Sequence, residues 1–161
     1  MAEHLAKHGD GVKDVAFRVH DCRKLFDSAV SRGAKVIVEP HVEEDADGSV
    51  VIATVATYGD TLHSFIERKG YKGAFLPNYR VIDEVDPFKG ATVHPGLEFI
   101  DHIVGNMGDH EMENTVQWYE KVLQFHRFWS VDDKQIHTDY SSLRSVVVAD
   151  YSEAVKMPIN E

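Results

Sequence analysis

The chain has 161 residues, of which 43% are hydrophobic and 27% are charged, a composition typical of a soluble globular protein with one domain or two small units. Its formal net charge of −10 argues against nucleic acid and anionic membranes as partners, because both attract basic surfaces. The single cysteine excludes an internal disulfide, and we find neither a signal peptide nor a membrane span. We therefore expect a cytoplasmic protein.

Residues 1–69 are predicted to form one unit with the order strand, helix and three strands. Alternating residues indicate a strand over 12–19, and Asp21 is placed to cap a helix that ends at Gly33. Three further strands are expected, over residues 34–42, 50–57 and 62–67. Within the last of them, His63 and Glu67 share one face, and we expect a surface ion pair there.

Residues 97–161 repeat the same order. A strand is expected over 97–106, and apolar positions from Met112 to Leu123 indicate an amphipathic helix. Strands over 125–131, 143–149 and 154–159 follow, with a polar loop over 132–142. The Pro- and Gly-rich segment 70–96 lies between the two units and is predicted to be a connector.

The fold class expected from this pattern is α+β, with two tandem β-α-β-β-β modules. One such module cannot cover its own sheet, so it needs a partner module with which to enclose a cavity. The two modules could pair with each other, or each could be half of a different domain in a longer protein. The length of the connector favours the second arrangement.

The strand over 97–106 holds the most informative residue, His102, which shares one face with Ile100 and Val104. A lone histidine on an apolar strand face is usually a core residue, and a metal site needs additional ligands nearby. Aligning the two modules places Val15 of the first over His102 of the second. If this position faces a cavity, the first module is apolar there and the second offers a nitrogen ligand.

Two other segments are weaker candidates. His137 and Asp139 have the spacing of metal ligands but lie in the polar loop, which is expected to be solvated. At the end of the chain, Pro158 implies an edge strand or a bulge, and Asn160 offers an amide. Composition alone favours the interpretation of these residues as a frayed chain terminus.

Five strings of sequence carry a resemblance to a known family, namely residues 7–14, 101–106, 124–133, 140–145 and 156–161. They closely resemble the 4-hydroxyphenylpyruvate dioxygenase family of the animal type, and the resemblance spans nearly the whole chain. It implies the vicinal-oxygen-chelate fold, in which four β-α-β-β-β modules form two domains. Residues 1–69 would be the second half of the N-terminal domain, 70–96 the connector, and 97–161 the first half of the catalytic domain.

The resemblance also implies a site. The family holds Fe(II) with two histidines and one glutamate, and His102 corresponds to the first histidine. The second histidine and the glutamate belong to a fourth module that this sequence lacks. Ser145 and Asn160 would hydrogen-bond to the substrate, Pro158 would shape the pocket wall, and Val104 would lie near the iron.

The implied reaction converts 4-hydroxyphenylpyruvate and O2 to homogentisate and CO2 in tyrosine and phenylalanine breakdown, with a homodimer expected for the full-length protein. With one iron ligand, the isolated chain is expected to be inactive. Three alternatives remain open: a non-catalytic fragment, a glyoxalase-like binding module whose two units pair around an empty pocket, and 4-hydroxymandelate synthase, whose strings match less well.

Overall fold

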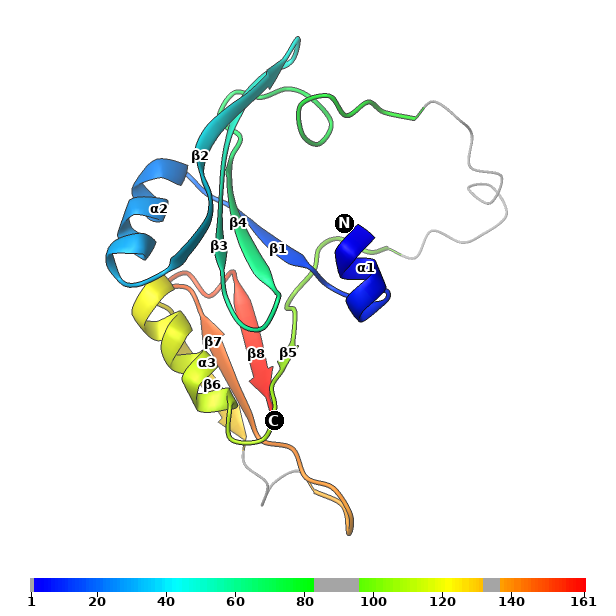
Figure 1. Cartoon of the computed structure of the whole chain (residues 1–161), viewed down its shortest axis with the longest axis vertical. Coiled ribbons are helices and arrows are strands. Elements are labelled where there is room, and N and C mark those ends of the chain that lie inside the picture. Colours follow the sequence, from blue (N-terminus) through cyan, green and yellow to red (C-terminus); the bar gives the residue numbers. More distant parts are fainter. Residues whose placement is uncertain (1, 83–95, 132–136) are drawn as a thin grey trace.

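The computed structural model describes residues 2–82, 96–131 and 137–161, which form two four-stranded sheets with helices against them (Figure 1). The first sheet has the order β1-β4-β3-β2 and the second the order β5-β8-β7-β6. The bounds in the first sheet are β1 (Asp14–Arg18), β2 (Lys35–Asp45), β3 (Gly48–Ala56) and β4 (Leu62–Glu67). Those in the second are β5 (Gly105–Asn106), β6 (His126–Val131), β7 (Ser145–Ala149) and β8 (Lys156–Asn160).

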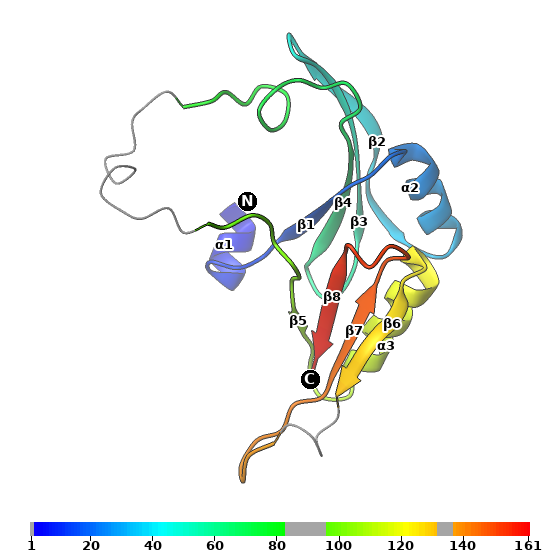
Figure 2. The ribbon, with the colours of Figure 1, turned by 180° about the vertical axis from the view of Figure 1, so that it is seen from behind.

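Both sheets have one topology. The first strand of each unit pairs in parallel with the last strand, and all other neighbours are antiparallel. The view from behind shows β5 and β8 side by side in the second sheet (Figure 2). The predicted α+β class with tandem β-α-β-β-β modules is therefore confirmed.

The helices begin in different ways. Helix α2 (Cys22–Ser31) has the predicted cap, because the Asp21 carboxylate accepts a hydrogen bond from the Lys24 amide at 2.9 Å. Helix α3 (Met112–Trp118) has no side-chain cap at its own N-cap residue; instead the Glu161 carboxylate accepts from the Met112 amide at 2.9 Å. The predicted helix over 112–123 is completed by a π-helical turn, η1 (Tyr119–Leu123). Helix α1 (Ala2–His8) was not predicted.

The two units pack against each other through α2 and η1. Val122 of η1 lies in the core of the first unit with Phe26 and Phe65, while Phe17 of β1 packs on the core of the second unit. Gly105 of β5 meets the first unit directly, because a Cβ added there would lie 2.6 Å from the Tyr58 hydroxyl. The close approach of Tyr58 thus favours glycine at this position.

His63 is buried in this interface, so the predicted surface ion pair with Glu67 is wrong. Its Nδ1–H donates to the Val15 carbonyl at 2.9 Å, and its Nε2 accepts from the Tyr119 hydroxyl at 2.7 Å. The Glu67 carboxylate instead accepts from the Cys22 amide at 3.0 Å. Strand β4 lies between two other strands, and its His63 face is turned towards the helices and the second unit. Burial lowers the pKa of His63, which favours the neutral ring.

The strand expected over 97–106 is much shorter. Only Gly105 and Asn106 form β5, preceded by an isolated bridge between His102 and Lys156. The segment pairs on one side only, and Leu97, Phe99 and Ile100 are exposed. Parts of the expected polar loop (132–136) and connector (83–95) lie outside the described residues. None of the helices in the described ranges is long and apolar enough to cross a membrane.

Candidate functional site

One face of the second sheet forms a cavity of about 530 Å³. The register of the strands explains which side chains meet there, because directly opposed residues point to the same face. Ser145 of β7 lies opposite Asn160 of β8, Val147 lies opposite Pro158, and His102 lies opposite Lys156. The residues that line the cavity are Asp101, His102, Val104, Phe128, Trp129, Leu143, Ser145, Val147, Lys156, Pro158 and Asn160.

All five residues singled out by the family resemblance therefore lie around one cavity, although they come from separate segments of the chain. They are His102, Val104, Ser145, Pro158 and Asn160. Ser145 is almost fully buried, whereas the His102 side chain is about half exposed. Pro158 and Asn160 belong to an ordered strand, β8, and not to a frayed end of the chain.

His102 is held in one orientation by its neighbour. The distance from its Nδ1 to Asp101 Oδ2 is 2.7 Å, and because a carboxylate accepts, Nδ1 carries the proton. In the neutral ring the lone pair is then on Nε2, and no partner for Nε2 is present among the described residues. Lys156 Nζ lies 3.7 Å from the other Asp101 oxygen. These contacts lower the pKa of Asp101, first through its hydrogen bond with His102 and then through the charge of Lys156.

Two aromatic side chains, Phe128 and Trp129, form part of the cavity wall. Consecutive residues of a regular strand point to opposite faces, so both could not line one cavity. The pairing of β6 with β7 shifts register between Arg127 and Trp129, and this bulge brings both rings to the cavity side. Both side chains remain about half exposed.

Sequence reasoning missed six lining residues: Asp101, Phe128, Trp129, Leu143, Val147 and Lys156. A signal existed for Lys156, because it alternates with Pro158 in the last predicted strand, 154–159, and with Asn160 directly after it. The alternation in 143–149 likewise places Val147 with Ser145. The bulge that exposes both aromatic rings leaves no recognisable mark in the sequence.

A metal at this cavity would find one suitable ligand in the described residues, the Nε2 of His102. A carboxylate bound to the other ring nitrogen is the usual support of a metal-binding histidine, so this residue fits the role. The described ranges contain one group of three possible ligands, Asp109, His110 and Glu161. Arg144 contacts the carboxylates of both Asp109 and Glu161, which disfavours a second cation there.

A scan against models of protein families gave no match. Curated relatives match over the whole chain. The 4-hydroxyphenylpyruvate dioxygenase of Dictyostelium discoideum is 58% identical over 161 residues, which are 99% of this chain and 44% of the relative. That of Danio rerio is 59% identical over 162 residues, covering 100% of this chain and 41% of the relative. The resemblance stated from the five strings is confirmed, and the chain spans about two fifths of these relatives' length.

A solved structure shows the same fold. A mutant of 4-hydroxymandelate synthase from Streptomyces coelicolor superimposes with a TM-score of 0.77 at 21% identity, over 99% of this chain and 43% of that chain. The superposition covers both units, so the synthase contains a stretch with this arrangement of two modules.

Proposed function

We propose that this chain is part of a 4-hydroxyphenylpyruvate dioxygenase, the family that it matches over its whole length. The observation that carries the proposal is the convergence of His102, Val104, Ser145, Pro158 and Asn160 on one cavity. The strand register produces this convergence, because it places Ser145, Pro158 and Asn160 on the sheet face that His102 also occupies. The whole enzyme would convert 4-hydroxyphenylpyruvate and O2 to homogentisate and CO2.

Each cavity residue would have a distinct task. His102 would bind Fe(II) through Nε2, with Asp101 fixing the ring through Nδ1. The iron, when bound, supplies the activation of O2. Ser145 and Asn160 face each other across β7 and β8 and would hydrogen-bond to the substrate.

The aromatic ring of the substrate would pack against the apolar part of the wall, formed by Phe128, Trp129 and Pro158. The same side chains would exclude water from the reacting groups. The remaining iron ligands would come from a part of the enzyme that the relatives contain and this chain does not. For the whole enzyme we also expect a cytoplasmic location and a homodimer.

The test is the substitution His102→Ala in the full-length protein, which should abolish homogentisate formation and lower the iron content of the purified enzyme. His110→Ala is the matched control, because this histidine is exposed and lies outside the cavity. Near-normal turnover of His102→Ala would contradict the assignment of His102 as an iron ligand.

A second candidate, a non-catalytic chain, is favoured by the single iron ligand among the described cavity residues. One neutral nitrogen cannot hold Fe(II) firmly. The purified 161-residue chain, assayed with added Fe(II) and ascorbate beside the full-length protein, should then form no homogentisate. Detectable homogentisate from the chain alone would refute this candidate.

A further inference from the structure

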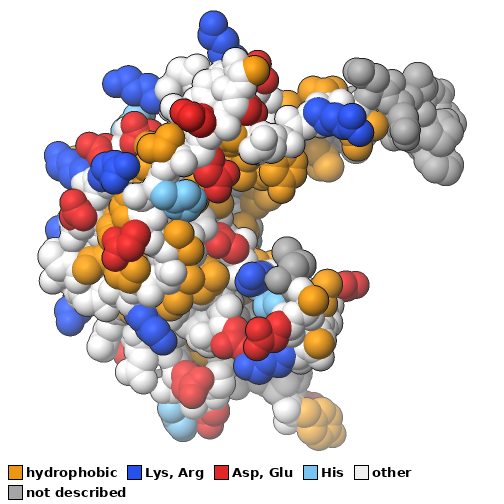
Figure 3. Space-filling model, turned by 45° about the horizontal axis from the view of Figure 1, so that its top comes forward, with side chains coloured by type: hydrophobic (Ala, Val, Ile, Leu, Met, Phe, Trp, Pro, Cys, Tyr) orange, Lys and Arg blue, Asp and Glu red, His pale blue; other side chains and the backbone are white. Residues whose placement is uncertain are grey.

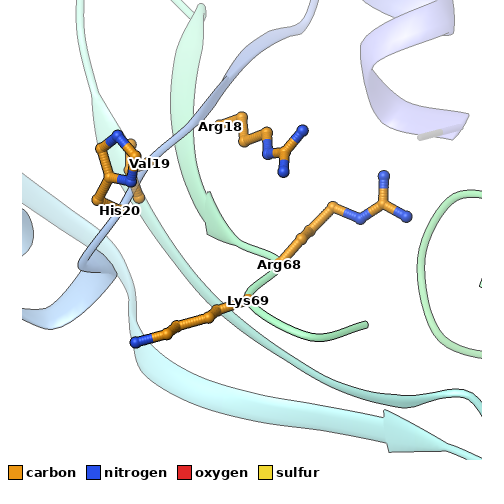
Figure 4. A pocket seen from close by; sticks show the side chains of 5 residues that line it. All are labelled: Arg18, Val19, His20, Arg68 and Lys69. Carbon is orange, nitrogen blue, oxygen red and sulfur yellow. The ribbon is translucent and has the colours of Figure 1, made fainter. Parts of the chain in front are cut away.

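A second pocket, of about 500 Å³, lies on the first unit and is lined mainly by basic residues (Figure 4). Four of its five lining residues carry basic side chains, and the fifth is Val19. The basic residues are Arg18, His20, Arg68 and Lys69. No acidic side chain lines the pocket in the described part of the chain, although the chain as a whole has a net charge of −10 and acidic side chains are spread over the face shown in Figure 3.

The topology of the first sheet brings these basic residues together. Strands β1 and β4 are parallel neighbours, with Arg18 opposite Ile66, and the Val19 amide continues the pairing by donating to the Ile66 carbonyl at 3.0 Å. The carboxyl ends of the two strands therefore meet at one edge of the sheet. Arg18 ends β1, and Arg68 follows directly after β4.

The Arg68 guanidinium is held in place before any ligand arrives. It donates to the Gly73 carbonyl at 2.9 Å and lies over the Tyr71 ring, 5.3 Å from its centroid. Its Nε is buried, and the described residues offer it no hydrogen-bond partner. An arginine fixed in this way loses little conformational freedom when it binds an anion.

Arg18 completes a pair of guanidinium groups. It forms no ion pair with an acidic side chain within residues 2–82, 96–131 and 137–161. The close view shows the Arg18 and Arg68 side chains extending to the same side, whereas Lys69 extends the other way (Figure 4). Like charges brought together repel, and an anion between them removes this cost.

We propose that this pocket binds a small soluble oxyanion, a phosphate or carboxylate group, between Arg18 and Arg68. Guanidinium groups bind such groups through short charge-assisted hydrogen bonds, often two at a time. Lys69 and His20 also line the pocket, but the proposed contacts are those of the two guanidinium groups. The site is separate from the His102 cavity, with which it shares no lining residue, and it does not depend on the proposed function.

Isothermal titration calorimetry with inorganic phosphate, at constant ionic strength, tests the proposal on the full-length protein and on the 161-residue chain. Phosphate should bind both, and the double variant Arg18→Gln/Arg68→Gln should bind it at least about tenfold more weakly. The matched control is Lys35→Gln/Lys121→Gln, which removes the same charge from exposed positions and should leave the affinity unchanged. Circular dichroism checks that every variant is folded.

Three outcomes overturn the proposal. Absence of phosphate binding does so directly, and equal weakening in the control variant shows a non-specific charge effect. Phosphate binding to the 161-residue chain but not to the full-length protein shows that a carboxylate of the longer protein already occupies the Arg18–Arg68 pair. Phosphate bound to iron at the His102 cavity would still bind to the Arg18→Gln/Arg68→Gln variant. This variant therefore distinguishes binding at the cavity from binding at the arginine pair.

Discussion

The two units share a topology but differ on the cavity face of their sheets. Leu62 is the first residue of β4, and Lys156 is the first residue of the corresponding strand β8. Asp14 lies opposite Leu62 in the first unit, and His102 lies opposite Lys156 in the second. Asp14 accepts a hydrogen bond from the Ser64 hydroxyl at 2.7 Å, whereas His102 donates to Asp101 and leaves one nitrogen unpaired within the described residues. The same topology therefore presents a carboxylate at this position in one unit and an imidazole beside aromatic rings in the other.

This comparison corrects the alignment of the modules. Val15 was placed over His102, but Val15 is a buried core residue opposite His63, so it points away from the face that matches the cavity. The equivalent of His102 is Asp14, one residue earlier. Because side chains alternate along a strand, a slip of one residue exchanges the two faces. The inference that the first module is apolar at this position is therefore wrong.

The largest effect is expected where the units meet. Tyr119→Phe removes the hydroxyl that donates to His63 Nε2 and leaves a buried acceptor unsatisfied, which should lower the free energy of unfolding by about 1–3 kcal/mol. Urea denaturation measures this loss. Tyr151→Phe is the control, since Tyr151 is almost fully exposed. If both variants were equally stable, the hydrogen bond between the units would not contribute.

A smaller effect should follow from pH. Burial lowers the pKa of His63, while its bond to the Val15 carbonyl and the charge of Asp14 act in the opposite direction. The unfolded chain therefore takes up a proton more readily than the folded one. Stability should be fully present above the ordinary histidine value of 6.5 and should fall as pH drops from there through the folded-state pKa.

Thermal melts across this range measure the effect, and His63→Gln should reduce the slope because it removes the titrating group. The Tyr119→Phe variant should keep a slope, since the imidazole remains buried. An unchanged pH dependence in His63→Gln would show that other groups control it.

The smallest effect on stability is expected for His102→Val. The His102 side chain is about half exposed, and its hydrogen-bond partner Asp101 is an exposed carboxylate, so the free energy of unfolding should change by no more than about 0.5 kcal/mol. Urea denaturation beside the wild type checks this value. A loss well above about 1 kcal/mol would mean that His102 has a structural role, as most lone histidines do.

The sequence allowed the order of elements to be predicted because each depends on local patterns. Strand β4 was predicted with its observed bounds, and the Asp21 cap was correct. The error at His63 has a different origin: alternation separates two faces of a strand but does not say which one another unit will cover. The family resemblance supplied the cavity residues, while the bulge beside Trp129 depends on pairing between distant strands.

The brevity of β5 has a consequence for ligand binding. Two paired residues and one isolated bridge tie the His102 segment to β8, so its amides should exchange with solvent much faster than those of β7. The backbone of this segment is therefore not pre-organised, even though Asp101 orients the His102 ring within it. Ordering the strand would lower the affinity of any metal for His102. A ligand bound in the cavity would in turn make this edge of the sheet more rigid.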